Sequence, residues 1–301
     1  MTDEDRTRRT GLLLGLGAYL SWGVLPLYFK AVDHVSALEI VCHRIVWSLV
    51  FLAILATFLR RWPGIRAAVS TPRVAMTLVL TSLLIGANWL IWIYAVVSGH
   101  VLEGSLGYYL NPLVNVLMGV FLLKERLSRP QVAAVFLAAA GVAVLAAGAG
   151  SGIWISLSLA LSFATYGFLR KIAPVDSIEG LTIETALLTP AALAWILILH
   201  DRGGGGGFLA GDGTTDLLLI AGGAITAIPL LLFTGAARRL PYSTLGFLQY
   251  IAPSLQFLLA VLAFGERFTL PHAICFGAIW TALAIFVFEG VRLSARSRAA
   301  H

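Results

Sequence analysis

The sequence predicts an all-α integral membrane protein of ten transmembrane helices, arranged as two inverted five-helix repeats around a central cavity. Of its 301 residues, 59% are hydrophobic and 12% are charged, whereas charged residues make up about a quarter of a typical soluble domain. Apolar runs of about 20 residues, enough to cross ~30 Å of hydrocarbon, recur along the chain. The third observation is an internal duplication, because residues 108–126 read YYLNPLVNVLMGVFLLKER and residues 249–267 read QYIAPSLQFLLAVLAFGER.

The membrane spans are predicted to be helices rather than barrel strands, because the apolar runs are long and do not alternate with polar residues. The ten expected spans are 11–29, 38–59, 74–97, 102–123, 130–149, 152–169, 178–199, 215–236, 243–264 and 271–290. The first follows an arginine-rich stretch, as the apolar core of a secretion signal does. It is too long for a signal and leads into further membrane, so we expect it to remain as the first span.

The basic residues predict the orientation of the chain. One set of alternate connections contains seventeen of them: Arg6, Arg8, Arg9, Arg60, Arg61, Arg66, Arg73, Lys124, Arg126, Arg129, Arg170, Lys171, Arg238, Arg239, Arg292, Arg296 and Arg298. The other set contains three: Lys30, Arg202 and Arg267. Since lysine and arginine accumulate in cytoplasmic loops, we expect a multi-pass protein of the cytoplasmic (inner) membrane with both termini in the cytoplasm. This topology explains the net charge of +6, and no nucleic-acid partner is expected.

The duplication divides the chain into two halves, 1–149 and 150–301, each with five expected spans. An odd number of spans per half places the two copies in opposite orientations, which makes an inverted repeat. Each copy contains a proline, Pro112 or Pro253, thirteen residues before a Glu-Arg pair. Because proline removes a backbone donor and kinks a helix, both prolines are predicted to act as gating hinges. Matched, proline-broken segments of this kind are typical of secondary transporters.

The residues that an enzyme or an ATP-driven pump would need are missing. The sequence contains no Walker-type GxxxxGK[ST], no HExxH and no GxSxG motif. All seven aspartates lie outside the expected spans or at their edges, so no intramembrane pair of catalytic aspartates is expected. Cys42 and Cys275 are isolated within spans and should pack as small apolar side chains. We therefore predict no enzymatic activity, no cofactor and no metal site.

Ionisable side chains inside membrane spans are costly and usually face a bundle interior or a wet cavity. Arg44 lies about two turns inside the second span, where it would bind a substrate carboxylate or phosphate, or form a fixed structural pair. Glu184 matches Arg44 in the second half and is a candidate for proton coupling, with a helix-packing role as the alternative. His43 is expected to line the cavity or to pack between helices. Glu103 either complements the N-terminus of its helix or couples protons at the external mouth.

Amides and aromatic rings complete the candidate cavity. The amides near the proline breaks, where freed backbone groups need partners, are Asn111, Asn115, Gln249 and Gln256. Asn88 is expected to orient the substrate together with Asn111 and Gln249. The candidates for an aromatic pocket that holds an amphipathic solute are Trp22, Trp89, Tyr94, Tyr108 and Tyr250. Interfacial belts and core packing are the alternative roles of these rings.

Six segments form a recognisable pattern: SWGVLPLYFK (21–30), HRIVWS (43–48), IGANWLIWIYAV (85–96), EGSLGYYLNPLVNVLMGV (103–120), STLGFLQYIAPSLQFLLAV (243–261) and IWTALAIF (279–286). This pattern covers nearly the whole chain and resembles the RarD branch of the EamA permeases, in the drug/metabolite transporter superfamily. The resemblance implies a ten-helix inner-membrane carrier that works by alternating access without ATP. It implies no single substrate, because superfamily members carry amino acids, drugs, sugars and nucleotide sugars.

The sequence therefore predicts a secondary active transporter that exports a small polar or amphipathic metabolite or drug by alternating access, with proton coupling as an option. Its expected partners are the small-molecule substrate and the lipid bilayer, and both a monomer and a homodimer are open. An uncoupled facilitative channel and a non-transporting membrane scaffold are the alternatives. The duplicated proline breaks disfavour the scaffold, since passive packing needs no matched irregularities.

Overall fold

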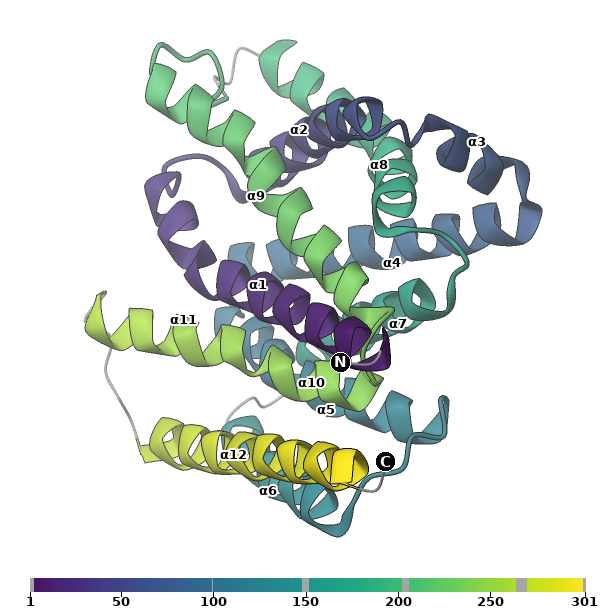
Figure 1. Ribbon diagram of the computed structural model, residues 1–301. Helices are drawn as coiled ribbons and strands as arrows, with labels where there is room; N and C mark the ends of the chain where they lie inside the picture. Colours follow the sequence, from purple (N-terminus) through teal and green to yellow (C-terminus); the bar gives the residue numbers. More distant parts are fainter. Residues whose placement is uncertain (1–2, 99, 148–151, 202–205, 264–269, 300–301) are drawn as a thin grey trace.

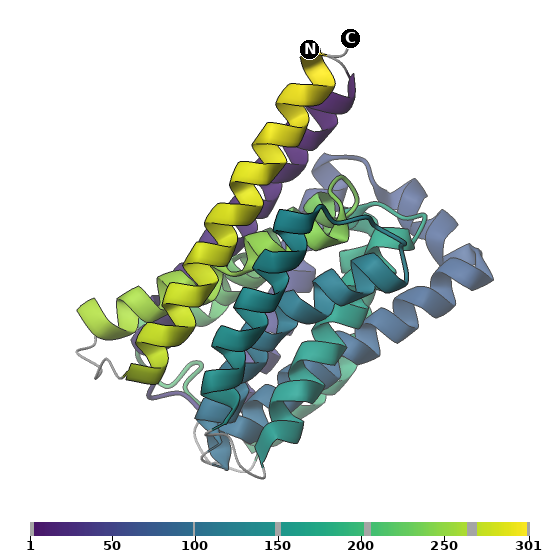
Figure 2. The ribbon, with the colours of Figure 1, turned by 90° about the horizontal axis from the view of Figure 1, so that it is seen from below.

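The computed structural model describes residues 3–98, 100–147, 152–201, 206–263 and 270–299, and within them the chain is helical without any strand. The helices are α1 (Asp3–Ala31), α2 (Ala37–Phe58), α3 (Trp62–Ser70), α4 (Pro72–Val97), α5 (Val101–Phe121), α6 (Arg129–Ala146), α7 (Ile153–Ile172), α8 (Ser177–Asp201), α9 (Gly213–Ala237), α10 (Tyr242–Gln249), α11 (Ile251–Leu262) and α12 (Leu270–Ala299). Figures 1 and 2 show a single bundle, in which the start of α1 and the end of α12 lie at the same end.

Most of the expected membrane spans correspond to single helices. Among the described residues, eight helices are long and apolar enough to cross a membrane: α1, α2, α4, α6, α7, α8, α9 and α12. Each coincides with an expected span, although α1 begins earlier than predicted and α12 continues beyond residue 290. The prediction of an all-α, multi-pass membrane protein is confirmed.

The two remaining expected spans, 102–123 and 243–264, contain the duplicated prolines. The first is α5, in which Asn111 and Asn115 interrupt the apolar run. The second is divided into α10 and α11 on either side of Tyr250, because Pro253 has no N–H to bond the carbonyl of Gln249. The ten membrane crossings and the inverted arrangement of the two halves therefore remain predictions. The short helix α3 in the 60–73 connection was not expected.

Contacts between helices occur in corresponding pairs when each helix of the first half is matched with its counterpart in the second half. The α1–α9 contact corresponds to α4–α7, the α1–α11 contact to α5–α7, and the α2–α9 contact to α4–α8. Contacts between equivalent helices are α2–α8, α5–α10 and α6–α12, the last pair lying side by side in Figure 1. The predicted boundary between the halves, at 149/150, lies outside the described residues, as does the second Glu-Arg pair at 266–267.

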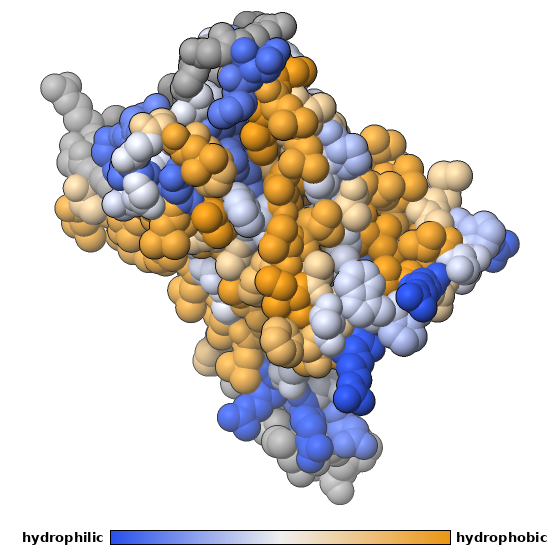
Figure 3. All heavy atoms as spheres, turned by 90° about the horizontal axis from the view of Figure 1, so that it is seen from above, coloured by the Kyte–Doolittle hydropathy of each residue, from blue (hydrophilic) through white to orange (hydrophobic). Residues whose placement is uncertain are grey.

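Large apolar side chains cover much of the outside of the bundle. Phe58, Phe121, Phe136 and Phe288 expose between 71% and 81% of their surfaces. On the face shown in Figure 3, apolar residues extend across the molecule and hydrophilic residues gather towards its edges. A bilayer solvates such an exterior, whereas a soluble monomer rarely exposes so large an apolar area.

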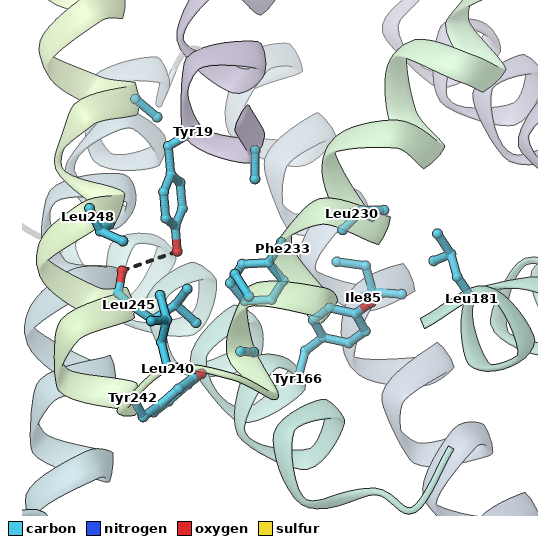
Figure 4. Close-up of a cluster of buried hydrophobic side chains, with 14 of the residues drawn as sticks. Tyr19, Ile85, Tyr166, Leu181, Leu230, Phe233, Leu240, Tyr242, Leu245 and Leu248 are labelled. Carbon is cyan, nitrogen blue, oxygen red and sulfur yellow. Dashed lines mark hydrogen bonds between the residues drawn. The ribbon is translucent and has the colours of Figure 1, made fainter. Parts of the chain in front are cut away.

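A cluster of buried side chains from both halves fills one part of the interior (Figure 4). The Tyr19 hydroxyl of α1 donates a 3.2 Å hydrogen bond to the carbonyl oxygen of Leu245 in α10. The rings of Tyr166 and Phe233 stack with their centroids 6.4 Å apart. These contacts join α1, α7, α9 and α10 into a common core.

Candidate functional site

The two copies of the duplicated segment meet inside the bundle. A Cβ atom added to Gly246 of α10 would lie only 2.7 Å from the carbonyl oxygen of Pro112 in α5. No side chain fits in that space, so glycine is what allows α10 to approach the proline break. Pro112 and Pro253, the predicted hinges, are both buried.

A chain of amides connects these segments. Asn111 donates to the carbonyl oxygen of Ala160 in α7 at 3.0 Å, and its Oδ1 accepts from Asn115 Nδ2 at 3.2 Å. Asn115 Nδ2 also donates to Gln249 Oε1 of α10 at 2.7 Å. Three of the four amides predicted near the proline breaks are thus brought together, whereas the fourth, Gln256, donates to the carbonyl oxygen of Trp22 at 2.9 Å. Their role in orienting a substrate stays a prediction.

Arg44 lies between aromatic rings and donates one hydrogen bond to a described residue. Its Nε donates to Thr226 Oγ1 of α9 at 2.7 Å. Its guanidinium carbon lies 5.3 Å from the ring centroid of Phe29 and 5.9 Å from that of Trp89, within cation–π range. Among the described residues no carboxylate forms an ion pair with Arg44, and its two Nη groups donate no hydrogen bond.

The hydroxyl of Tyr28 resembles the two Nη groups of Arg44 in having no hydrogen-bond partner among the described residues. A Cβ atom on Gly222 would touch both the Tyr28 hydroxyl and the Cγ of Arg44, so the tyrosine lies beside the arginine. The hydroxyl is buried and has no hydrogen-bond partner among the described residues. We call Tyr28, Phe29, Arg44, Trp89, Tyr108 and Thr226 the Arg44 site.

Tyr108 is the most exposed aromatic residue of this site. It lies between the face of α5 that packs on α7, at Gly107, and the face that packs on α10, at Pro112. The ring of Tyr108 lies 5.2 Å from that of Trp92 in α4, and the side chain is near enough to Arg44 for their charges to interact. It nevertheless exposes 40% of its surface.

Glu184 is buried, and both of its carboxylate oxygens have polar partners. It accepts hydrogen bonds from Thr81 at 2.6 Å and from Tyr166 at 3.2 Å, and its Oε1 lies 3.5 Å from Arg170 Nε. Both charged side chains are almost fully buried. This arrangement matches the helix-packing alternative for Glu184, while a role in proton coupling is untested.

The position of Arg170 corrects the sequence analysis. The charge pattern assigned it to a cytoplasmic connection, but α7 continues past it to Ile172 and its side chain is completely buried. Space for the guanidinium comes from Gly180, whose missing side chain would collide with it. The sequence signal for a buried arginine here was Gly180, which lies about one helical turn before Glu184.

Two further contacts, which the sequence analysis missed, hold opposite ends of the α2–α8 pair. Near the start of α2, Glu39 Oε1 accepts from the backbone N–H of Phe208, which follows α8, at 3.2 Å. Near the start of α8, Glu179 Oε1 accepts from Arg61, which follows α2, at 3.2 Å. Each glutamate also lies against a glycine of that connection, Gly206 or Gly64. We call these the Glu39 contact and the Glu179 contact.

The signal for these contacts was a second repeat, since residues 35–39 read VSALE and residues 175–179 read VDSIE. His43 belongs to the Glu39 contact. Its ring lies 4.6 Å from that of Phe208 and its Nε2 is 3.9 Å from Glu39 Oε1. His43 thus packs on Phe208, which belongs to the same apolar cluster as Tyr28 and Phe29 of the Arg44 site.

Asp176 extends the Glu179 contact into an ion-pair network. It accepts hydrogen bonds from Arg238 and from Arg61, the latter at 3.2 Å. The bond from Arg238 holds the pKa of this carboxyl below its usual range, and Arg61 adds to the effect. The network ties together the ends of α2, α8 and α9.

The remaining candidates are distributed around the site. Asn88 donates to Leu159 O at 3.0 Å and to Ser162 Oγ at 2.9 Å, so its amide joins α4 to α7. Trp22 lies in the core cluster, with its ring 5.6 Å from that of Phe233.

Three candidates lie farther along the helices. Tyr94 is 48% exposed and stacks on His100, at the end of α4. The Tyr250 hydroxyl is buried without a partner among the described residues. The carbonyl oxygen of Glu103 accepts from Ser156 at 2.5 Å, in the first turn of α5. None of these contacts tests the roles predicted for these side chains.

Comparisons with known proteins agree with the architecture. Residues 9–147 match the model of the "EamA-like transporter family". An "Uncharacterized transporter" of Vibrio cholerae is 48% identical over 100% of this chain and 99% of its own. "Protein RarD" of Escherichia coli is 44% identical over 98% of this chain and 99% of its own. "Chloramphenicol-sensitive protein RarD" of Pseudomonas aeruginosa is 35% identical over 94% and 95%.

A solved crystal structure has the same fold, with a TM-score of 0.72 at 24% identity over 92% of this chain and 97% of the other. The sequence likeness to the RarD proteins extends over nearly the full length of the chain. The protein belongs to the EamA-like transporter family, as a RarD-like permease.

Proposed function

We propose that this permease is a secondary active transporter of the cytoplasmic membrane that exports a small polar or amphipathic solute through the Arg44 site. The observation that carries the proposal is the setting of Arg44, a half-buried charge within α2 that lacks an internal counter-ion among the described residues. A charge at this depth is costly unless a partner neutralises it. A transported anionic group would be that partner, with Asn88, Asn111 and Gln249 as further hydrogen-bonding groups around it.

Two inverted five-helix halves are part of the proposal. The matched helix contacts support them, since exchanging the halves maps each of these contacts onto another. The common end shared by the start of α1 and the end of α12 supports an even number of crossings. Eight apolar helices, together with α5 and the α10–α11 pair, would supply ten.

Alternating access is supported by the Glu39 and Glu179 contacts. They close opposite ends of the same helix pair, and each joins one half of the chain to the other. Opening one while the other stays closed would expose the interior to one side at a time. Pro112 and Pro253 would absorb the bending, because each frees a backbone carbonyl from its helical bond.

Proton coupling is proposed to involve Glu184 or Glu103. Protonation of Glu184 would remove the charge that Arg170 neutralises, which would loosen the contact between α7 and α8. Glu184→Gln and Glu103→Gln should each be compared with the unmodified protein for the pH dependence of transport. A variant with an unchanged pH profile removes that glutamate from the coupling proposal.

The testing experiment is uptake into proteoliposomes with and without an imposed pH gradient. The panel should include amino acids, sugars and amphipathic drugs, among them chloramphenicol. Arg44→Ala is the test variant, and Arg66→Ala, which removes an exposed arginine of α3, is the matched control. We expect accumulation that Arg44→Ala abolishes and Arg66→Ala retains. Equal transport by both variants would contradict the assignment of the Arg44 site.

The same vesicles separate a carrier from a channel. Substrate on the far side should accelerate uptake by a carrier, because the loaded site returns faster than the empty one. A linear flux that neither saturates nor responds to substrate on the far side would indicate an uncoupled channel.

A further inference from the structure

We propose that the Arg44 site selects organic monoanions in which one carboxylate is attached to an apolar, preferably aromatic body, and rejects the same body with an ammonium group. This inference rests on the proposed function and narrows it to a substrate class.

The charge of Arg44 can be compared with that of the matching residue in the other half of the chain. Arg44 and Glu184 lie 140 residues apart, close to the 141-residue separation of the proline segments, and so hold matching places in the two halves. The charge of Glu184 is neutralised by Arg170 and bonded by Thr81 and Tyr166. At Arg44 the described residues supply one neutral acceptor, Thr226. The positive charge is left for a ligand.

The guanidinium of Arg44 favours a ligand with a single, planar anionic group. Both Nη groups of Arg44 carry no hydrogen bond to a described residue, and they are not sealed from solvent. A guanidinium presents its N–H groups as a planar fork that matches a carboxylate. One positive charge balances one carboxylate, whereas a phosphate monoester carries about −1.5 to −2 at pH 7 and would leave negative charge uncompensated.

Tyr28 places a second hydrogen-bonding group beside Arg44. The side chain is 8% exposed, its hydroxyl has no partner among the described residues, and it lies next to Arg44. A buried hydroxyl without a partner is unfavourable, so the group is prepared to donate to an acceptor that arrives with the ligand. It would bond the same anionic group that Arg44 holds.

The aromatic rings around Arg44 favour an apolar body on the ligand. Phe29 and Trp89 lie over the guanidinium, and Tyr108 provides an exposed ring on the α5 side. Such walls favour a flat apolar group through burial and ring contacts. An ammonium group would meet the charge of Arg44 and would find no ion-pairing carboxylate in the described part of the site.

The test uses four compounds with a common phenyl body: 3-phenylpropanoate, 3-phenylpropanol, L-phenylalanine and 2-phenylethylamine. Equilibrium binding of radiolabelled 3-phenylpropanoate to the purified, full-length protein at neutral pH gives the affinity, and the other three serve as competitors. We expect the amine to compete worst and the alcohol and amino acid to compete more weakly than unlabelled carboxylate. Equal competition by the amine, the alcohol or the amino acid overturns the proposal.

Variants tie the binding to named groups. Arg44→Gln should weaken binding of 3-phenylpropanoate by about tenfold or more, since hydrogen bonds to charged groups are among the stronger ones. Tyr28→Phe should weaken it by about 3- to 10-fold, and it removes only a hydroxyl without a partner, so it should fold normally. Arg66→Gln should bind as the unmodified protein does. Unchanged affinity in Tyr28→Phe and in folded Arg44→Gln overturns the assignment.

Uptake of the same compounds into proteoliposomes distinguishes this inference from the proposed function. Protein-free liposomes correct for diffusion of the protonated acid. Binding of 3-phenylpropanoate that depends on Arg44, without protein-dependent uptake of any compound in either panel, would support the site and contradict transport. Uptake of other solutes together with no binding of 3-phenylpropanoate would retain the transporter and overturn the monoanion class.

Discussion

Asn115 of α5 donates a 2.7 Å hydrogen bond to Gln249 of α10, which joins the two copies of the duplicated segment through their side chains. Asn115 is completely buried and Gln249 nearly so. The bond therefore lies where the alternative partner, water, is scarce, and its loss should be felt in stability as well as in transport.

Replacing Asn115 by leucine should destabilise the protein by about 1–3 kcal/mol for each buried group left without a partner, here Gln249 Oε1 and Asn111 Oδ1. Replacing both partners of the bond between α5 and α10, in Asn115→Leu/Gln249→Leu, should cost less than the sum of the single variants. The measurement is a double-mutant cycle on the thermal unfolding of the purified protein. Strict additivity would show that the two amides act independently.

Gly246→Ala should separate α5 from α10 and reduce both transport and the thermal unfolding temperature. The added methyl group would lie 2.7 Å from the carbonyl oxygen of Pro112, and backbone cannot move aside as a flexible side chain can. Gly277→Ala in α12 is the matched control, because no atom lies within 4 Å of its added Cβ. It should leave both properties unchanged or raise stability slightly. Similar losses in the two variants would disprove the close-contact role of Gly246.

The end contacts should have opposite effects on access to the interior. Glu39→Gln weakens the bond to Phe208 and should favour opening at that end, while Glu179→Gln weakens the bond to Arg61 and should favour opening at the other. The reporter is Tyr108→Cys with Cys42 and Cys275 changed to serine, labelled by a membrane-impermeant maleimide from each side in turn. The two glutamine variants should increase labelling from opposite sides. An increase from the same side in both would reject alternating access by these contacts.

Removing one partner of the buried pair should be more harmful than removing both. Arg170→Gln or Glu184→Gln leaves an uncompensated buried charge, which typically costs about 3–5 kcal/mol. The double variant removes both charges and should recover part of that loss in thermal unfolding. No recovery would mean that the two side chains are not coupled to one another.

The Asp176 network predicts a defined pH response. Since the folded pKa of Asp176 is lowered by Arg238 and Arg61, its stabilising effect is present above the unfolded value of about 3.9 and is lost as the pH falls through the lower, folded value. Asp176→Asn should therefore be less stable than the unmodified protein at neutral pH, and the two unfolding curves should converge in strong acid. A difference that persists unchanged at low pH would assign the effect to something other than ionisation.

The positions of the membrane helices were predictable because the length and hydropathy of a span are local properties of the sequence. The sequence did not predict that the ninth expected span divides into two helices at Tyr250. Pro253 indicated an irregularity there, but proline alone does not determine whether a helix bends or is interrupted. Arg170 was misassigned for a related reason. A basic residue at the end of an apolar run looks the same whether it reaches water or turns inward to a carboxylate on another helix.

The Arg44 site was predicted in part. Arg44 and Trp89 stood out because charge and aromatic rings are conspicuous within apolar runs. Phe29 and Thr226 did not, because their importance depends on tertiary contacts with α2. The Glu39 and Glu179 contacts were visible as a repeated five-residue pattern, but their partners lie in connections more than 100 residues away along the chain.

The opposite charges at positions 44 and 184 also bear on the symmetry of the protein. An assembly of two identical five-helix polypeptides would carry the same residue at both positions, either two arginines or two glutamates. A chain whose halves differ in sequence can hold a neutralised ion pair at Glu184 in one half and an open charge at Arg44 in the other. The selectivity proposed for the interior therefore depends on the difference between the halves and would be lost in a perfectly symmetric assembly.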